Sequence, residues 1–222
     1  MGVVENLKSL KETLPGEVTL VAVSKRKPDE MVLEAHGAGH RDFGENMVQD
    51  LVARRERLPG DIRWHMIGHL QSNKVKYMAS FVHMIHGVDS LKLLKMINKE
   101  AAKHNRVIDC LLQLRIAEEE TKFGLTREAA LEILNSDSFP EMKNIRIRGL
   151  MGMATYTQNR EQIRAEFQHL NRIFEEMKAS VFQGEAHFDQ RSFGMSGDYQ
   201  LAVEEGTTMV RIGSLIFGLR NY

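Results

Sequence analysis

The sequence predicts an α/β fold: a single (β/α)8 barrel of the TIM type, preceded by one extra N-terminal helix. The first observation is a strict alternation of short apolar runs, typical of buried strands, with longer amphipathic stretches, typical of helices. This alternation indicates parallel strands, because a parallel pair needs a long crossover connection. The second observation is that about eight such repeats fit into 222 residues, which suits a closed barrel.

The individual elements follow in order along the chain. A lone amphipathic stretch at residues 3–14 predicts the extra helix. The predicted strands are residues 19–24, 42–45, 62–67, 84–88, 107–116, 145–154, 188–193 and 208–217. The predicted helices between and after them are residues 29–38, 47–58, 73–81, 91–104, 127–135, 160–178 and 198–205. Asn46, Asn73 and Ser90 stand where helix N-caps are expected.

An open doubly wound sheet is the alternative fold for alternating strands and helices. Nucleotide-binding sheets of that kind carry a G-x-G-x-x-G turn or a G-x-x-x-x-G-K-[ST] loop, and the sequence contains neither. It also shows no linker or low-complexity tract. The closed barrel is therefore favoured, as one domain that spans residues 1–222.

The composition limits the classes of function. Lys and Arg total 30, Asp and Glu also total 30, and the formal net charge is zero. Without an excess of positive charge we expect no binding to nucleic acid or to an anionic membrane. No signal peptide is recognisable, and no apolar run approaches the roughly 20 residues that cross a bilayer. The single cysteine, Cys110, lies in an apolar stretch, which indicates a buried thiol and fits a cytoplasmic location.

Chemistry in such a barrel is expected at the carboxyl ends of the strands, and phosphate groups are favoured after the seventh and eighth strands. Lys25 closes the first predicted strand, and Asn46 follows the second. Ser196 lies after the seventh strand, while Gly213 and Ser214 lie at the end of the eighth. These five residues are therefore candidates for one site.

The alternation of side chains along a strand adds Arg211 to the candidates. Lys25 shares its strand face with Val21 and Val23, and Arg211 shares its face with Met209. If both faces point into the barrel, Lys25 and Arg211 converge. An arginine within an apolar strand is hard to explain as a surface residue, because a buried guanidinium needs a partner.

A lysine beside small and hydroxyl-bearing residues suits a ligand with two functional groups. Burial at the barrel mouth would lower the lysine pKa from about 10.4 and give a neutral amine that attacks an aldehyde. Backbone N–H groups at a strand end or helix start bind phosphate. Pyridoxal phosphate (PLP) carries both groups. The alternatives are a solvated Lys25 beside Arg26 and Lys27, and an ordinary helix cap formed by Ser196 and Asp198.

Other conspicuous residues have simpler explanations. His65 and His69 have H-x-x-x-H spacing, but that spacing aligns metal ligands on a helix and here it spans a strand and its loop. We therefore predict no metal site, and a structural role for both. Residues 118–122 form a charge run after the fifth strand, which is most simply solvated. Met151 and Met153 are expected to fill the barrel mouth, where thioethers pack well against a planar ring.

Six blocks of sequence carry a resemblance to a known family. They are residues 21–25 (VAVSK), 43–46 (FGEN), 64–74 (WHMIGHLQSNK), 149–151 (GLM), 194–198 (GMSGD) and 205–218 (EGTTMVRIGSLIFG). With these blocks in order, the chain resembles the pyridoxal phosphate homeostasis proteins, also called the YggS or proline synthetase co-transcribed family, over nearly its whole length. The resemblance implies a (β/α)8 barrel like the N-terminal domain of alanine racemase.

The resemblance also implies roles for individual residues. Lys25 corresponds to the lysine that holds PLP as a covalent aldimine, and Arg211 to the arginine that faces the pyridine nitrogen. Lys27 and Lys122 become candidates for contacts with the cofactor in transit. Asn46 corresponds to a residue beside the ring, Met151 is expected at the same mouth, and the phosphate cradle corresponds to Ser196, Gly213 and Ser214.

Three functions are compatible with these residues. The first is a protein of intracellular PLP (vitamin B6) homeostasis. An arginine at the pyridine nitrogen leaves the cofactor a weak electron sink, so we expect no catalytic residues. The expected partners are apo PLP-dependent enzymes, which the protein would contact transiently. The second is a PLP-dependent amino-acid racemase, which needs a base opposite Lys25, and only Tyr156 among the tyrosines follows a nearby strand. The third is a Schiff-base aldolase that acts on a phosphorylated sugar without a cofactor. We expect a monomer, because racemases dimerise through a second domain that this sequence lacks.

Overall fold

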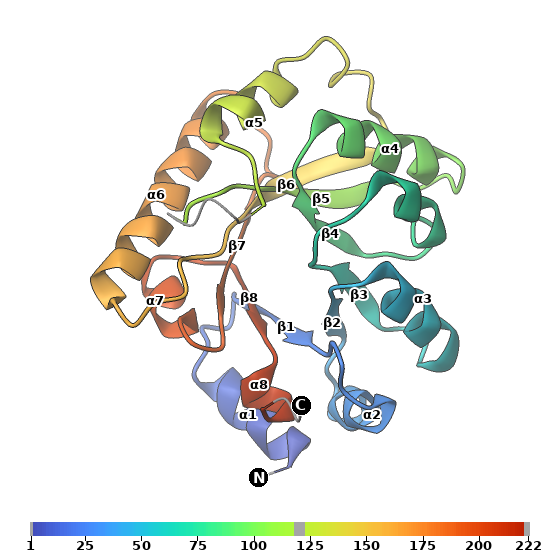
Figure 1. Cartoon of the computed structure of the whole chain (residues 1–222), viewed down its shortest axis with the longest axis vertical. Helices are drawn as coiled ribbons and strands as arrows, with labels where there is room; N and C mark the ends of the chain where they lie inside the picture. Colours follow the sequence, from blue (N-terminus) through green and yellow to red (C-terminus); the bar gives the residue numbers. More distant parts are fainter. Residues whose placement is uncertain (1, 118–122, 220–222) are drawn as a thin grey trace.

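Eight parallel strands close into a barrel in the computed structural model, which describes residues 2–117 and 123–219 (Figure 1). Each strand pairs with the next one in the chain, and β8 pairs with β1. The predicted fold class is therefore confirmed. The strands are β1 (Thr19–Val23), β2 (Asp42–Glu45), β3 (Arg63–Met66), β4 (Met84–Val88), β5 (Ile108–Gln113), β6 (Ile145–Met151), β7 (Gln190–Met195) and β8 (Met209–Ile212).

Helices surround the barrel, and most of them join successive strands (Figure 1). The extra N-terminal helix α1 packs against α8 and α2, and the Asn6 side chain donates a hydrogen bond to the carbonyl of Ile216 over 3.1 Å. Because α8 is a single turn, α1 completes the outer layer there. The helices are α1 (Val3–Glu12), α2 (Asp29–Gly37), α3 (Val48–Arg57), the 3₁₀ helix η1 (Ser72–Tyr77), α4 (Leu91–Ala102), α5 (Arg127–Leu134), α6 (Arg160–Ala179), α7 (Tyr199–Glu204) and α8 (Ser214–Phe217).

The end of the eighth strand differs from the prediction. Residues 208–217 were expected to be extended throughout, but β8 ends at Ile212 and α8 begins at Ser214. Gly213 makes this change of direction possible, because a Cβ at this position would lie 2.8 Å from the carbonyl oxygen of Val23. The apolar run is thus shared between a strand and one helical turn.

The predicted helix at residues 73–81 is a short 3₁₀ helix, η1. Backbone bonds span three residues there, as from the Met78 N–H to the Val75 carbonyl over 3.1 Å, and Val75 and Met78 are buried at that same spacing. Asn73 lies inside η1 and Asn46 lies one residue before the Met47 cap of α3, so both predicted caps are wrong. Ser90 is confirmed, since its hydroxyl accepts a hydrogen bond from the Leu93 N–H over 3.3 Å.

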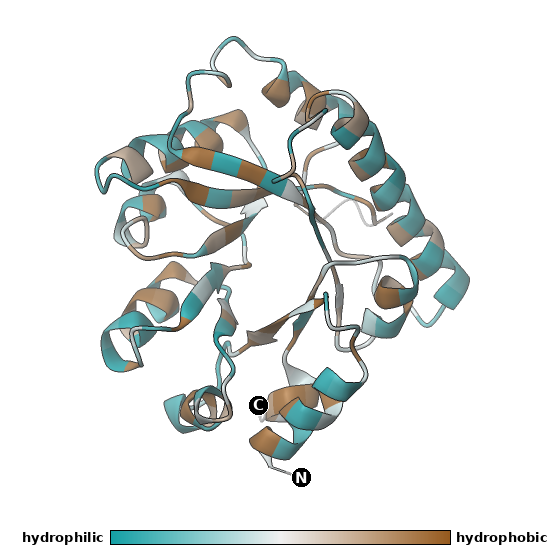
Figure 2. Cartoon of the chain, turned by 180° about the vertical axis from the view of Figure 1, so that it is seen from behind, coloured by the Kyte–Doolittle hydropathy of each residue, from teal (hydrophilic) through white to brown (hydrophobic). Residues whose placement is uncertain are grey.

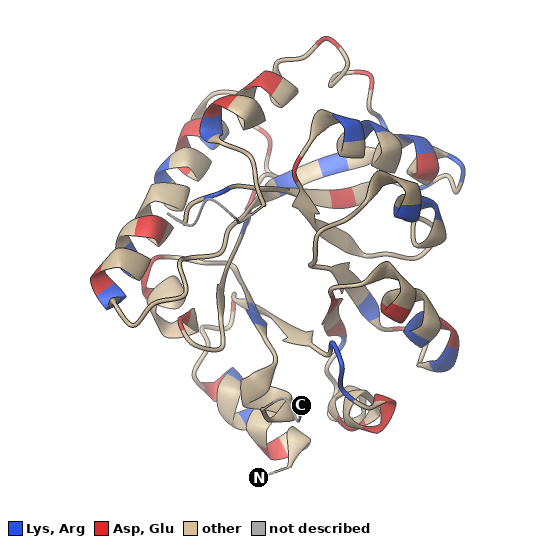
Figure 3. Cartoon of the chain, viewed as in Figure 1, with Lys and Arg blue, Asp and Glu red and all other residues tan. Residues whose placement is uncertain are grey.

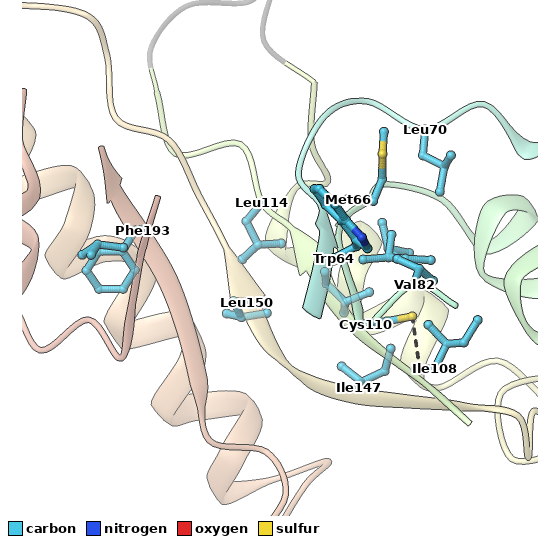
Figure 4. Close-up of a cluster of buried hydrophobic side chains, with 14 of the residues drawn as sticks. Trp64, Met66, Leu70, Val82, Ile108, Cys110, Leu114, Ile147, Leu150 and Phe193 are labelled. Carbon is cyan, nitrogen blue, oxygen red and sulfur yellow. Dashed lines mark hydrogen bonds between the residues drawn. The ribbon is translucent and has the colours of Figure 1, made fainter. Parts of the chain in front are cut away.

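The main hydrophobic core lies between the outer face of the barrel and the helices. Trp64 and Cys110 are fully buried in it, and Figure 4 shows their surroundings. The Cys110 thiol lies 3.6 Å from the carbonyl of Ile108, and burial raises the pKa of this thiol. The prediction of a buried thiol is confirmed, and the raised pKa disfavours the reactive thiolate.

A second, smaller cluster fills the inside of the barrel. It consists of Val21, Met84, Leu111, Met151 and Met209, with Met153 packed against it. The predicted inward orientation of the faces of β1 and β8 is thus confirmed at Val21 and Met209. Three flexible methionine side chains give this interior an apolar lining that adapts to its neighbours.

The surface agrees with the balanced composition. Hydrophobic and hydrophilic residues alternate along the turns of the helices in Figure 2, and both signs of charge are interspersed over them in Figure 3. Among the described residues, no helix combines the length and the apolar character that a bilayer-spanning segment requires.

Candidate cofactor site at the carboxyl ends of the strands

Lys25, Gly213 and Ser214 follow the ends of β1 and β8, which lie side by side. Val21 pairs with Arg211 in the sheet, and Ala22 pairs with Ile212. Just beyond these pairs Gly213 packs on Val23, since a Cβ on Gly213 would lie 3.3 Å from the Val23 Cβ as well as 2.8 Å from its carbonyl oxygen. The structure therefore brings the loop that carries Lys25 next to the predicted phosphate cradle.

Lys25 is half-buried in the loop that follows β1. Buried polar side chains from the end of β2 and from α3 hold this loop in place. The Ser24 hydroxyl donates to Oε1 of Glu45 over 2.6 Å, and Nε of Arg54 lies 3.3 Å from the same oxygen. Arg54 also donates to the carbonyl oxygen of Lys27. Burial raises the pKa of Glu45, while Arg54 and Ser24 oppose this effect.

The sequence interpretation missed this anchor. Arg54 is one of three arginines in the last turns of α3, and nothing in the local pattern marks it as buried. Its exposed fraction is only 6%, because α3 packs this residue under the β1 loop. The anchor fixes the backbone on both sides of Lys25.

Lys27 points to the carboxyl end of α8. Its Nζ donates to the carbonyl oxygens of Phe217, Gly218 and Leu219, over 3.1, 2.9 and 2.9 Å. The ammonium group therefore caps the carboxyl end of α8, where positive charge is favourable. A role for Lys27 in cofactor transit stays a prediction, and Lys122 lies outside the described residues.

The loops after β7 and β8 meet at the predicted phosphate cradle. The Gly213 N–H donates to the Ser196 hydroxyl over 3.4 Å, and Ser214 opens α8 with its side chain exposed. The Asp198 carboxylate accepts a hydrogen bond from the Met195 N–H over 2.5 Å, which closes the turn at the end of β7. Ser196 is therefore not a cap of α7, because its hydroxyl joins the two loops instead.

Arg211 lies inside the barrel, one residue before the end of β8. Its exposed fraction is 4%, and its Nη1 donates to both the carbonyl (2.6 Å) and the hydroxyl (2.7 Å) of Ser192. Its Nη2 donates to the carbonyl of Gly152 over 3.0 Å. Burial lowers the pKa of the guanidinium to about 10, so the group remains charged at neutral pH. The buried guanidinium is thus satisfied by oxygens of Ser192 on β7 and of Gly152, the residue after β6.

Asn46 and Met151 lie at two other strand ends around the same mouth. Asn46 follows β2 and is half-buried, and its backbone packs closely on Gly68, where a Cβ would lie 2.3 Å from the Asn46 carbonyl oxygen. Met151 ends β6 and is 1% exposed within the interior cluster. Met151 therefore forms part of the apolar floor beneath the strand ends.

Two further expectations concern residues outside this group. The two histidines of the H-x-x-x-H pair diverge: His65 bonds to Asp42 over 3.2 Å, whereas His69 pairs with Asp89 over 3.1 Å. The two rings therefore have separate carboxylate partners, and the absence of a shared metal ion stays a prediction. Tyr156 is 95% exposed, so its phenol is not held inside the barrel mouth.

Comparisons with known proteins agree with the fold and with the predicted family. Residues 3–221 match the family model of the alanine racemase N-terminal domain. The chain is 38% identical over 204 residues to the pyridoxal phosphate homeostasis protein of Aquifex aeolicus, covering 91% of this chain and 87% of that protein.

Solved structures give the same result. PipY of Synechococcus elongatus is 33% identical and superposes with TM-scores of 0.90 without PLP and 0.88 with PLP bound, covering 97% of this chain and 100% of PipY. An alanine racemase of Clostridium difficile is only 13% identical, with a TM-score of 0.79 over 57% of its chain, and shows a shared fold alone.

The barrel and the match to the alanine racemase N-terminal domain define an alanine racemase-like barrel protein. Within that class, the chain belongs to the family of pyridoxal phosphate homeostasis proteins, as the six sequence blocks predicted.

Proposed function

We propose that this protein binds PLP covalently through Nζ of Lys25 and takes part in intracellular PLP homeostasis, with little or no catalysis. The observation that carries the proposal is the packing of Gly213 on Val23, which brings the end of β1, just before Lys25, beside Gly213 and Ser214, and Gly213 in turn donates a hydrogen bond to Ser196 in the loop after β7. A relative of the same fold and 33% identity has a structure with PLP bound.

The residues present fit the chemical groups of PLP. An amine at one strand end suits its aldehyde, and a hydroxyl with backbone N–H groups at the neighbouring end suits its phosphate. Arg211 uses three of its five N–H groups on Ser192 and Gly152, which leaves two donors for a ring nitrogen. Bound PLP supplies an electron-withdrawing ring conjugated to an aldehyde carbon.

Arg211 is also the reason to expect little catalysis. Its pKa of about 10 keeps the guanidinium protonated at neutral pH, so the side chain donates to a ring nitrogen and does not protonate it. Enzymes that need a strong electron sink place a carboxylate there instead. A racemase would also need a proton donor opposite Lys25, and the exposed Tyr156 is not held in such a position. We propose that the protein stores PLP in the cytoplasm as a monomer and releases it to apo-enzymes.

Absorbance spectra of three proteins test this function. Wild-type protein incubated with PLP should show a visible absorbance band, Lys25→Ala should lack it, and Lys27→Ala should keep it as the matched control. Racemase assays on the PLP-loaded wild type should give turnover at background level. Amino-acid racemisation that depends on Lys25 would replace the proposal with the racemase alternative. A wild type that stays colourless with PLP would contradict it and favour an aldolase.

A further inference from the structure

A continuous line of hydrogen bonds crosses the inside of the barrel from Arg211 to Asp42. Arg211 Nη1 lies 2.7 Å from the Ser192 hydroxyl, which lies 3.1 Å from Nδ1 of His86. Nε2 of His86 lies 2.9 Å from Nδ1 of His65, and Nε2 of His65 lies 3.2 Å from Oδ1 of Asp42. We call these five residues the polar relay. They come from β8, β7, β4, β3 and β2, and each of them is at most 9% exposed.

With a neutral His65, the charged ends fix the direction of every bond in the polar relay. An ionised carboxylate only accepts, so Nε2 of His65 carries a hydrogen and, in a neutral ring, Nδ1 of His65 accepts. Nε2 of His86 must then donate to it, and Nδ1 of His86 accepts from the Ser192 hydroxyl. That hydroxyl in turn accepts from Arg211, which has only donors. The whole line therefore runs one way, from cation to anion.

The protonation states of His86 and Asp42 that this direction requires agree with their surroundings. Burial lowers the pKa of His86 well below 6.5, so that ring is neutral at pH 7. Burial would raise the pKa of Asp42, but hydrogen bonds from Arg63 and His65 outweigh it and keep the carboxylate ionised. Both ends of the polar relay are thus charged, and His86 in its middle is neutral.

A metal site is the other use these residues suggest. Ligand atoms of Asp42, His65 and His83 lie within 4.8 Å of one another. However, both oxygens of Asp42 accept from Arg63, over 2.7 and 2.5 Å, and Nε2 of His65 holds the hydrogen that it donates to Asp42. A cation would have to displace the guanidinium of Arg63, so we interpret this cluster as the anionic end of the polar relay.

The polar relay gives Arg211 a second counter-charge, in addition to Asp198, whose negative charge opposes the lowering of the Arg211 pKa by burial. None of the ion pairs among the described residues includes Arg211. Hydrogen bonds in a buried line polarise one another, so a carboxylate at one end strengthens the donor at the other. We propose that Asp42, His65, His86 and Ser192 are positioning residues that hold the Arg211 guanidinium for the PLP ring. This role rests on the proposed function, because it needs PLP as the ligand of Arg211.

The direction of the polar relay is testable in the PLP-free wild type. Long-range ¹H–¹⁵N NMR of histidine side chains, assigned with His65→Gln and His86→Gln, reports which ring nitrogen carries hydrogen. We expect both rings to be neutral Nε2–H tautomers at pH 7. A charged ring, or an Nδ1–H tautomer at either position, would overturn the polar relay. This result does not depend on PLP binding.

The role of the polar relay in holding PLP is tested by Asp42→Asn, with Asp109→Asn as its matched control. Asp109 is also buried near the amino-terminal ends of the strands, but it pairs with Arg146 and Arg148 (2.7 and 3.0 Å) outside the polar relay. Asp42→Asn should weaken PLP binding about threefold to tenfold and shift the absorbance maximum of the bound form, and Asp109→Asn should do neither.

Circular dichroism of each variant before titration shows whether it is folded. If a variant does not fold, the NMR result on the wild type still decides the direction of the polar relay. Equal losses in both variants, or a loss in neither, would overturn the positioning role. A wild type that binds no PLP would overturn the proposed function and the positioning role together, and would leave the tautomer result intact.

Discussion

Gly213→Ala should loosen the junction between the ends of β8 and β1 and weaken PLP binding. The added Cβ would lie 2.8 Å from the carbonyl oxygen of Val23 and 3.3 Å from its Cβ. Backbone atoms cannot turn away as a flexible side chain does, so one strand end must shift by several tenths of an ångström. Overpacking of this kind costs about 1–3 kcal/mol. For a chain of this size that corresponds to a melting temperature lower by about 2–12 °C.

Gly197→Ala is the matched control for this prediction. Gly197 lies in the neighbouring loop after β7, next to Ser196, and a Cβ there would meet nothing within 4 Å. We expect Gly197→Ala to keep the wild-type melting temperature, and Gly213→Ala to lower both that temperature and the PLP affinity measured by absorbance titration. A Gly213→Ala protein that matches the wild type in both assays would refute the packing argument. Equal losses in the two variants would refute the specific role of Gly213.

Other parts of the account make three further predictions. Arg54→Met should lower the free energy of unfolding by about 3–5 kcal/mol at pH 7, because it leaves the buried Glu45 without its cation; a loss below 1 kcal/mol in urea denaturation would contradict the anchoring role of Arg54. The pKa of His40 falls from 6.5 to about 4 on folding, chiefly through burial, so the unfolded chain binds more protons between these values. The free energy of unfolding should therefore decrease by about 3 kcal/mol as the pH falls from 6.5 to 4, and His40→Gln should flatten this slope; an unchanged slope would show that His40 is not buried neutral. Lys27→Met should cost about 1 kcal/mol in thermal denaturation through loss of the cap on α8, and a variant as stable as the wild type would show that the three carbonyl contacts contribute little.

The fold could be predicted because its signal is periodic and repeated. Each strand is a short apolar run and each connection is long, so the parallel barrel follows from the order of elements alone. The two-residue period of a strand also placed Val21 and Met209 inside the barrel correctly. The end of β8 was missed, because an apolar run such as residues 208–217 looks the same in a strand and in a buried helical turn.

The candidate site was predictable only in part. The strand-end residues could be found because functional sites of such barrels lie at the carboxyl ends of the strands. Arg211 could be found because a charged residue is unusual inside an apolar strand. The hydrogen-bond partners of Arg211 could not be predicted. Barrel closure, and not spacing in the sequence, brings Ser192 next to Arg211 and His86 next to Ser192. A weaker signal was present: His65 and His86 interrupt apolar strands just as Arg211 does.

Covalent trapping of PLP on the protein tests the central claim most directly. PLP-loaded wild type would be reduced with borohydride, digested and mapped by mass spectrometry. We predict one pyridoxyl group, on the peptide that contains Lys25, and none in Lys25→Ala. A reduced protein without the adduct, or an adduct that remains in Lys25→Ala at a different lysine, would contradict the account.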